Sequence, residues 1–454
     1  MPHQNTIAAI STPPGRSALA VVRVSGPDAF AIATELGLPP AEPRVTQHAT
    51  VSYPGTGLPV DEVVAVRFKA PASYTGEDML ELSCHGGALA PQLVLEAVCA
   101  AGSRPAEPGE FTRRAFLNGK MDLMQVEATL DLIEARSPAM HRAALFQLER
   151  GLSRRIEDLR QGLLELQALL AYDIDFPEED DGPVPAERID GTAIQLSDQL
   201  ARMLDLVPEG ELLRDGALTV MAGRPNAGKS SLFNALLGFE RAIVTEEPGT
   251  TRDAIEALVS VAGYPFRVVD TAGLGEDPGR VEKMGIEVAR SYLDRADIVL
   301  LCVEAGRQPG ADETDFLTEY GRTDGSRILV LRTKADLHPD CGKATTVGLE
   351  MEVCISAHTG EGIPELREAL LQRAFSGVRG EEEVPIVTRE RQVRCLTKAW
   401  EDVEAFQAAR VDGLPSEVAG THVQDATLAL EDLLGTVTTD DVLDVVFSSF
   451  CVGK

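Results

Sequence analysis

One short stretch constrains this chain more than any other. Residues 223–231 read Gly-Arg-Pro-Asn-Ala-Gly-Lys-Ser-Ser, the spacing of a phosphate-binding loop in which two glycines five positions apart precede Lys and Ser. The apolar run 217–222 predicts a buried strand before the loop, and 231–237 predicts a helix that Gly238 ends. This order of strand, loop and helix favours a phosphate site over a chance glycine-rich turn.

The residues of this loop have distinct expected contacts. Its glycines let backbone N–H groups turn toward a polyphosphate, and the helix N-terminus adds partial positive charge. Lys229 is expected to contact the β and γ phosphates, and the Ser230 hydroxyl to bind Mg²⁺. The loop residues predicted to bind the nucleotide are Asn226, Ala227, Gly228, Lys229, Ser230 and Ser231.

The size and charge of the chain limit its class. At 454 residues it is long enough for about three domains. Acidic residues number 72 against 42 basic ones, a formal charge of -30, so the whole chain has no basic footprint for nucleic-acid phosphates. An RNA client would need a local patch or a basic partner. With no signal-like segment and no run of about eighteen apolar residues, we expect a soluble, cytoplasmic protein without a membrane contact.

Disulfide and metal chemistry are not indicated. The seven cysteines are odd in number and irregularly spaced, with no Cys-x-x-Cys pair, so we expect neither a disulfide framework nor a zinc site. Most of them are interpreted as small buried hydrophobic residues. The acidic run 173–181 is interpreted as a solvated connector rather than a metal cluster.

The hydrophobic pattern changes along the chain and predicts a multidomain protein. Residues 1–118 alternate short β-rich runs with turn signals, which indicates an α+β domain. Residues 119–214 have a helical pattern, and apolar residues over 145–170 form one core-facing stripe. Strands and helices alternate over 215–378, which predicts an α/β domain that contains the phosphate loop. Helices resume over 379–454, so the all-α domain is predicted to be discontinuous, with the nucleotide domain inserted in it.

Two further motifs are expected to sense the γ-phosphate. After the predicted strand 266–269, a carboxylate can reach Mg²⁺ through water and a glycine N–H can meet the γ-phosphate; these residues are Asp270, Thr271, Ala272 and Gly273. Residues 249–253 read Gly-Thr-Thr-Arg-Asp, the place for a switch threonine that binds Mg²⁺ only while the γ-phosphate is present. Thr250 and Thr251 are the candidates, with Thr251 as the Mg²⁺ ligand beside Ser230.

Two loops later in the domain select the base. Asp336 can accept hydrogen bonds from both N1–H and N2–H of guanine, and the backbone of Ala357 can donate to the guanine carbonyl. The predicted base-binding residues are Thr333, Lys334, Asp336, Ser356, Ala357 and His358. All five elements in this order resemble the translation-factor class of small GTPases, which implies that the α/β domain is a Ras-like P-loop G domain. Thr333 stands where Asn is usual, and its shorter side chain puts the bracing of the loop in doubt, but the guanine-specific residues remain and predict GTP.

The hydrolysis step needs a substitute for a missing glutamine. Leu274 follows the Asp-Thr-Ala-Gly motif, where a Ras-like protein carries the glutamine that orients water. Asn226 and the threonine-rich switch loop resemble GTPases in which K⁺ supplies positive charge instead of an arginine finger. The expected K⁺ ligands are Asn226, Thr245, Glu247 and Thr250. A tolerated loop residue is the alternative for Asn226, and the carboxylates and proline at 246–248 depart from the common pattern of the loop.

The chain as a whole resembles one family. The phosphate loop, the run 108–120 and the terminal run 447–454 together are similar to the bacterial tRNA uridine-modifying GTPases of the MnmE (TrmE) family. The resemblance covers the whole chain and its domain order. It implies a GTP-hydrolysing homodimer whose N-terminal domain binds a tetrahydrofolate derivative, either 5-formyl- or methylene-tetrahydrofolate, and mediates dimerisation.

The resemblance also implies partners and site residues. With a flavin-dependent partner, MnmG (GidA), such a protein adds an aminomethyl-type group, carboxymethylaminomethyl, to carbon 5 of the wobble uridine of certain tRNAs. The tRNA would be bound mostly by the partner, which fits the acidic charge. By position, the folate pocket would use Arg23, Glu81, Lys120 and Lys454, and Glu282 would place the attacking water. Cys451 has no evident activating group and stays unassigned.

Two other functions remain in competition. A GTP-switched assembly module, such as a ribosome-biogenesis factor, would need neither a folate-like N-terminal domain nor the terminal Cys-Val-Gly-Lys. A folate-dependent methyltransferase with a regulatory G domain would need an acid/base pair that is not evident in the sequence. We therefore expect a GTPase that drives tRNA modification.

Overall fold

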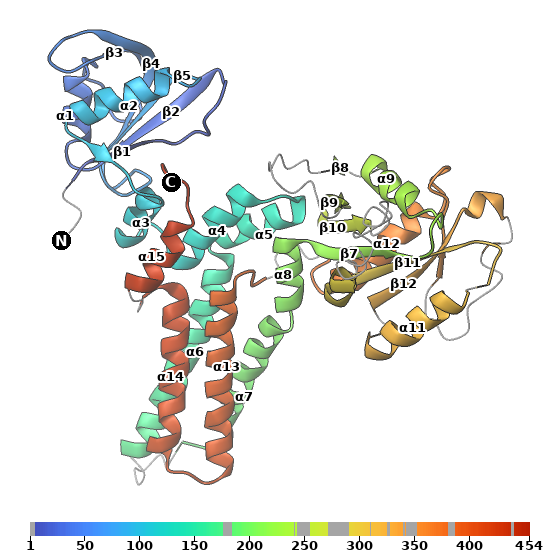
Figure 1. Cartoon of the computed structure of the whole chain (residues 1–454). Coiled ribbons are helices and arrows are strands. Elements are labelled where there is room, and N and C mark those ends of the chain that lie inside the picture. The colour runs from blue at the N-terminus through green and yellow to red at the C-terminus, as the bar shows by residue number, and fades with distance from the viewer. Residues whose placement is uncertain are drawn as a thin grey trace. The chain divides into compact units, whose positions relative to one another are not determined.

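The structure is a computed structural model of the chain (Figure 1). It divides into two compact units, one of Met1–Leu130 with Glu431–Lys454 and one of Asp131–Leu430. The residues that it describes are 5–175, 184–239, 241–242, 255–270, 290–308, 310–324, 327–338, 341, 352–379, 386–436 and 440–454.

The first unit is built on a mostly antiparallel sheet. Its strand order is β3-β4-β5-β2-β1-β6, and only β1 and β6 pair in parallel. Alternate residues of β2 from Ala20 to Val24 are buried because successive side chains of a strand point to opposite faces, so one face packs on the core with the helices α1 and α2. The bounds are β1 Ile7–Ile10, β2 Leu19–Ser25, β3 Gln47–Ser52, β4 Pro59–Phe68, β5 Met79–His85, β6 Arg104–Pro105, α1 Ala29–Glu35 and α2 Ala90–Ala100.

The end of the chain belongs to this first unit. Helix α15 (Asp440–Ser448) contributes Leu443 and Phe447 to a small apolar cluster with Leu123 and Val126 of α4 (Leu123–Glu134). Helix α3 (Glu110–Leu117) contacts α15, and its Arg113 Nη1 lies 2.9 Å from Asp444 Oδ1.

Long helices form one part of the second unit. The apolar stripe of α6 (Gly151–Asp175) is buried from Leu152 to Leu170, as the helical period predicts. The predicted stripe is wrong at Leu145, which is exposed, because α5 ends at Leu148 and a turn with φ of +68° at Arg150 breaks the period. The further helices are α5 Pro138–Leu148, α7 Ala186–Leu204, α8 Val207–Asp215, α13 Glu390–Val411 and α14 Ser416–Leu434, of which α14 runs on into the first unit.

Helices from before and after the nucleotide domain pack side by side. Arg410 Nε of α13 lies 3.0 Å from Asp190 Oδ1 of α7, and Gln167 of α6 donates to Thr427 of α14 at 2.8 Å. The discontinuous helical domain predicted from the sequence is thereby confirmed, and so is the multidomain α+β, all-α and α/β fold class.

The other part of the second unit is a mixed seven-stranded sheet with helices around it (Figure 1). The order is β13-β12-β11-β7-β10-β9-β8, and the strands from β13 to β10 are parallel. Strand β7 is buried at every residue because clusters of apolar side chains cover both faces. The bounds are β7 Ala217–Ala222, β8 Arg241–Ala242, β9 Ile255–Val261, β10 Tyr264–Asp270, β11 Ile298–Glu304, β12 Ile328–Thr333, β13 Glu352–Cys354, α9 Lys229–Phe239, α11 Ala311–Asp324 and α12 Ile363–Ala374.

This topology decides where the site lies. The carboxyl ends of β7, β10, β12 and β13 point to the same edge of the parallel sheet. Ligands of such sheets bind outside that edge. The predicted nucleotide-binding residues within the described ranges lie at these strand ends or in the segments that directly follow them.

Candidate nucleotide-binding site

The phosphate loop has the backbone that its glycines allow. It runs from the end of β7 to the start of α9 at Lys229. Helix α9 begins two residues before the predicted helix and continues through Gly238, so the prediction that Gly238 ends it is wrong. Gly223 has a φ of +134°, and a Cβ there would collide with the carbonyl oxygen of Cys302. Gly228 has a φ of +88° and Asn226 one of +63°. These left-handed turns bring the loop around the N-terminus of α9.

Lys229 holds its charge inside this loop. Its residue is 6% exposed, and its Nζ donates to the carbonyl oxygens of Gly223 at 2.8 Å and Arg224 at 2.9 Å. A buried ammonium encircled by the loop is placed to meet phosphate oxygens that enter the same ring of N–H groups.

A hydroxyl and a carboxylate converge beside the lysine. Ser230 Oγ donates to Asp270 Oδ2 at 2.7 Å, and Asp270 is 2% exposed at the end of β10. Hard oxygen ligands of this kind suit Mg²⁺, which binds a nucleotide through one or two protein oxygens and the phosphates. The residues present therefore fit the predicted ion. The described residues contain no group of three or more His, Cys, Asp or Glu that could hold a metal by themselves.

The base loop is braced to the phosphate loop by Thr333. Its Oγ1 donates to the carbonyl oxygen of Ala227 at 2.7 Å and is 3.4 Å from the carbonyl oxygen of Val303. Thr333 is 3% exposed. The shorter side chain in place of Asn therefore keeps a bridge between the two loops.

The remaining base residues follow in two adjacent turns. Lys334 has a φ of +58°, which starts a short 3-10 turn (Ala335–Leu337) that leaves Asp336 exposed. The N–H of Ala335 donates to the carbonyl oxygen of Ile355 at 3.0 Å, so this turn is joined to the residue before Ser356. Ser356 is buried and its Oγ accepts from the N–H of Thr359 at 3.2 Å.

The described part of the site thus unites most predicted nucleotide residues at one edge. These residues lie at the ends of β10 and β12, in the loop from β7 to α9, at the start of α9, or in the turns after β12 and β13: Asn226, Ala227, Gly228, Lys229, Ser230, Ser231, Asp270, Thr333, Lys334, Asp336, Ser356, Ala357 and His358. Apart from Asn226 and Asp270, the switch, K⁺, γ-phosphate-sensing and water-placing candidates lie outside the described residues; they are Thr245, Glu247, Thr250, Thr251, Thr271, Ala272, Gly273 and Glu282.

A second polar site lies in the first unit. Arg23 of β2 faces Glu81 across the antiparallel pair with β5, and Arg23 Nε lies 2.8 Å from Glu81 Oε1. The guanidinium of Arg23 also lies 5.6 Å from the centre of the Tyr74 ring. Arg23 Nη1 is buried without a hydrogen-bond partner in the part of the chain that the structure describes. An acceptor group of a ligand would satisfy it, so this pair fits a polar or anionic ligand.

The C-terminus reaches the same site. Burial lowers the pKa of Lys454, and the positive charge of Arg23 lowers that pKa further. The tail is tied to the residue that follows β1 because Ser11 Oγ donates to the carbonyl oxygen of Gly453 at 3.1 Å. Lys120 is exposed, and its Nζ donates to the carbonyl oxygen of Pro71 at 3.0 Å. Arg23 and Glu81 are therefore paired and Lys454 is close enough to Arg23 for the two charges to interact, whereas the side chain of Lys120 contacts the 71–76 loop.

Sequence reasoning missed residues that support this site. Tyr74 accompanies Arg23 and shares a hydrogen bond of 2.9 Å with Thr112, and Arg114 is 1% exposed in an ion pair with Glu77. The signal was the density of charge and glycine over 74–82, which exceeds what packing needs but does not say which side chains meet.

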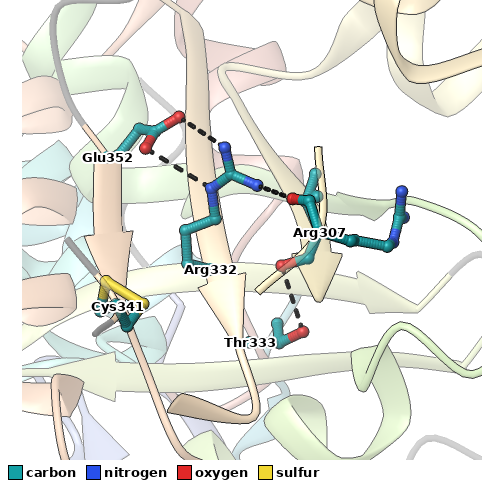
Figure 2. The surroundings of a disulfide bond; sticks show 7 residues. Arg307, Arg332, Thr333, Cys341 and Glu352 are labelled. Atoms are coloured by element: carbon teal, nitrogen blue, oxygen red, sulfur yellow. Dashed lines mark hydrogen bonds and ion pairs between the residues drawn. A yellow bond between two sulfur atoms is a disulfide. The ribbon is translucent and has the colours of Figure 1, made fainter. Parts of the chain in front are cut away.

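The prediction of no disulfide is wrong for one pair. Cys341 and Cys354 form a disulfide with a Cα–Cα distance of 6.1 Å. Figure 2 shows it beside Arg332 and Glu352, whose side chains pair across β12 and β13. The number and spacing of the cysteines could not reveal this pair, because Cys354 is placed by the pairing of β13 with β12 in the folded sheet. The prediction of buried thiols holds for Cys84, Cys302 and Cys395, and burial raises the pKa of Cys302 to about 12.

The parallel sheet, its phosphate loop and the Ser230–Asp270 pair define a P-loop GTPase that also carries a helical domain and an α+β N-terminal domain. The description "GTP-binding protein TrmE N-terminus" matches residues 6–120, and "MnmE helical domain" matches 123–451. The chain belongs to the MnmE family of tRNA modification GTPases.

Curated relatives match over their full length. The "tRNA modification GTPase MnmE" of Geobacter sulfurreducens is 39% identical over 99% of both chains. The protein of the same name from Salinibacter ruber is 40% identical over 100% of both chains. Among solved structures, the G domain of the T. maritima FeoB iron transporter is 28% identical, covers 35% of this chain and 98% of its own, and has a TM-score of 0.27. Among the described residues, no helix is long and apolar enough to cross a membrane.

Proposed function

We propose that this GTPase acts with a flavin-dependent partner to add a carboxymethylaminomethyl-type group to carbon 5 of the wobble uridine of certain tRNAs. The partner would be the flavoprotein MnmG (GidA), and it would supply most of the basic surface for tRNA. The observation that carries this proposal is the presence in one chain of a guanine-nucleotide site and of the Arg23, Glu81 and Lys454 site. A pure GTP switch needs only the first.

In this proposal the first unit binds a tetrahydrofolate derivative, 5-formyl- or methylene-tetrahydrofolate. When bound, this group supplies the one-carbon unit. The Glu81 carboxylate accepts from the donor edge of a pterin ring, while Arg23 and Lys454 pair with acceptor or anionic groups. Lys120, whose side chain contacts the 71–76 loop, would join them. The proposed protein is a homodimer through its N-terminal domains.

In the nucleotide site each residue has a separate task. Lys229 would stabilise charge on the β and γ phosphates, Ser230 and Thr251 would hold Mg²⁺, and Asp270 would reach that ion through water. Thr271, Ala272 and Gly273, which follow Asp270, would sense the γ-phosphate. Asn226 and the switch-loop residues Thr245, Glu247 and Thr250 would hold K⁺, and Glu282 would orient water indirectly.

The test is mass spectrometry of tRNA nucleosides from cells with and without the gene. Loss of the substituent at carbon 5 of the wobble uridine is the expected result, and complementation with a Lys229→Ala variant should fail to restore it. An unchanged nucleoside profile would contradict the proposal. It would favour a GTP-switched assembly module, such as a ribosome-biogenesis factor, with another client.

A further inference from the structure

The Cys341–Cys354 disulfide lies between the two loops proposed to bind guanine. Cys354 ends β13 two positions before Ser356, and Cys341 follows Asp336 by five positions. The sequence separation of the two cysteines is 13 residues. Figure 2 shows the sulfur–sulfur bond at the same strand ends as Thr333 and Arg332. The bond therefore joins the chain after one base loop to the chain before the other.

Hydrogen bonds already join the ends of β12 and β13, from which the two base loops begin. The N–H of Ile355 donates to the carbonyl oxygen of Arg332 at 2.8 Å, and the N–H of Ala335 donates to the carbonyl oxygen of Ile355 at 3.0 Å. Arg332 and Glu352 add a pair at 3.2 Å whose side chains are 7% and 10% exposed. Strand β13 thus stays on β12 whether or not the disulfide is present.

The described residues from Asp336 to Cys341 depend more on the disulfide. The Asp336 turn continues through His338, whose N–H donates to the carbonyl oxygen of Ala335 at 2.9 Å. Cys341 N–H donates to the carbonyl oxygen of His338 at 2.9 Å. These are local bonds within one turn. The bond from Ala335 holds the start of that turn, and the covalent link at Cys341 adds a second attachment after it, so its loss increases the conformational freedom of the segment that presents Asp336.

The two cysteines of the bond are less buried than the third cysteine of the nucleotide domain. Cys341 and Cys354 are in partly exposed residues, whereas Cys302, at the floor of the same site, is fully buried. Burial raises the pKa of Cys302 to about 12, so this neighbouring thiol is protonated and inert near neutral pH. In the described part of the nucleotide domain, thiol–disulfide exchange therefore takes place at Cys341 and Cys354 rather than at Cys302.

We propose that the Cys341–Cys354 bond is a redox clamp on guanine-nucleotide affinity. A small dithiol reduces it by thiol–disulfide exchange: one thiolate attacks a sulfur of the bond, a mixed disulfide forms, and the second thiolate releases it. Two electrons pass to the protein, Cys341 and Cys354 become thiols, and the dithiol becomes a cyclic disulfide. The reduced protein holds Asp336 less firmly and releases GDP faster.

Linkage makes the effect reciprocal. If the bond tightens GDP binding by a given factor, bound GDP shifts the thiol–disulfide equilibrium toward the bond by the same factor. The inference rests on the proposed guanine site, because it concerns the loops that carry Asp336 and Ser356. Neither the folate site nor the client of the GTPase enters it.

The test uses the full-length protein and a fluorescent GDP analogue in stopped-flow displacement. After treatment with the thiol oxidant diamide or with reduced dithiothreitol, mass spectrometry of peptides verifies the state of both cysteines. We expect dissociation about 5- to 10-fold faster from the reduced protein. The Cys341→Ser/Cys354→Ser variant should release the analogue at the fast rate after either treatment. Cys451→Ser, which replaces an exposed cysteine of the first unit, should keep the difference.

Three results would overturn the clamp. Equal rates from oxidised and reduced wild type, with the bond verified as formed and broken, would show that the link does not affect the base loops. Free thiols at both positions after the oxidising treatment would show that the bond does not form in solution. No binding of GDP in either state, with ATP bound instead, would overturn the guanine site itself and the clamp with it.

Discussion

The hydroxyl of Thr333 donates a hydrogen bond of 2.7 Å to the carbonyl oxygen of Ala227, so the loop that reads the base is tied to the loop that binds phosphate. Both groups are buried, Thr333 at 3% and Ala227 at 3% exposure. An unpaired carbonyl in such a place costs about 1–3 kcal/mol. The bond therefore couples two parts of one site that are far apart in sequence.

We predict that Thr333→Val, which keeps the shape and removes the donor, weakens GDP binding by about 10-fold. Thr333→Ser, which keeps the hydroxyl, is the matched control and should bind nearly as tightly as wild type. Isothermal titration with GDP gives both values. Equal affinity in the valine variant would mean that the bond does not contribute to binding.

Asn226 is predicted to make hydrolysis depend on the alkali cation. GTP should be hydrolysed at least about 10-fold faster in KCl than in NaCl, because K⁺ supplies positive charge to the transition state. Asn226→Ala should abolish the difference. Asn234→Ala, an exposed residue of α9, should retain it. Equal wild-type rates in the two salts, measured by phosphate release, would contradict the K⁺ site.

Glu282 is predicted to act on the attacking water rather than on the nucleotide. Glu282→Ala should lower the single-turnover hydrolysis rate by about 100-fold while the GTP dissociation constant stays nearly constant. Glu319→Ala, an exposed carboxylate of α11, is the control and should hydrolyse normally. A normal rate in the Glu282 variant would remove the assignment.

Gly453 is predicted to position Lys454. Its φ is +98°, and a Cβ there would lie 2.6 Å from the carbonyl oxygen of Ile10 and 2.9 Å from Ser11 Cα. Gly453→Ala should displace the tail and weaken binding of 5-formyl-tetrahydrofolate by about 10-fold, since overpacking costs about 1–3 kcal/mol. Val452→Ala, which shortens an exposed side chain, should leave it unchanged. Isothermal titration calorimetry measures the affinity for 5-formyl-tetrahydrofolate. Equal affinity in both variants would show that the C-terminal tail does not contribute to the folate site.

Glu110 is predicted to make the first unit sensitive to acid. Burial raises the pKa of its carboxyl, but hydrogen bonds from Arg104, the Glu107 N–H and Arg114 outweigh burial and hold the pKa below its usual 4.5. A depressed carboxyl pKa stabilises the fold above the unfolded-state pKa. The stabilisation is therefore lost as the pH falls from about 4.5 through the lower folded-state pKa.

The measurement is amide hydrogen exchange of the β1 and β2 peptides in the full chain at pH 7 and at pH 4. Glu110→Gln should reduce protection by about 2 kcal/mol at pH 7, because the buried Arg114 loses a charged partner, and by less at pH 4. Glu107→Gln, an exposed neighbour, is the control. The same deficit at both pH values would show that the Glu110 charge is not responsible.

Local patterns predicted the parts of this fold that depend on neighbours in sequence. The buried strand at 217–222, the glycines of the phosphate loop and the stripe of α6 are set by backbone sterics and hydrophobic period, which the sequence displays directly. The failures are at breaks in a period, such as Leu145 beside the turn at Arg150, where one left-handed residue redirects the next helix.

By itself, then, the sequence determined the order of domains, the phosphate loop and the identity of the residues that follow each strand. Only the tertiary structure decided which of those residues meet. Thr333 reaches Ala227, Cys341 pairs with Cys354, and Lys454 lies near enough to Arg23 for their charges to interact. These contacts depend on strand order and on how the end of the chain returns to its beginning. Such long-range packing is settled by the balance of burial and chain entropy over the whole fold, which no short stretch of sequence contains.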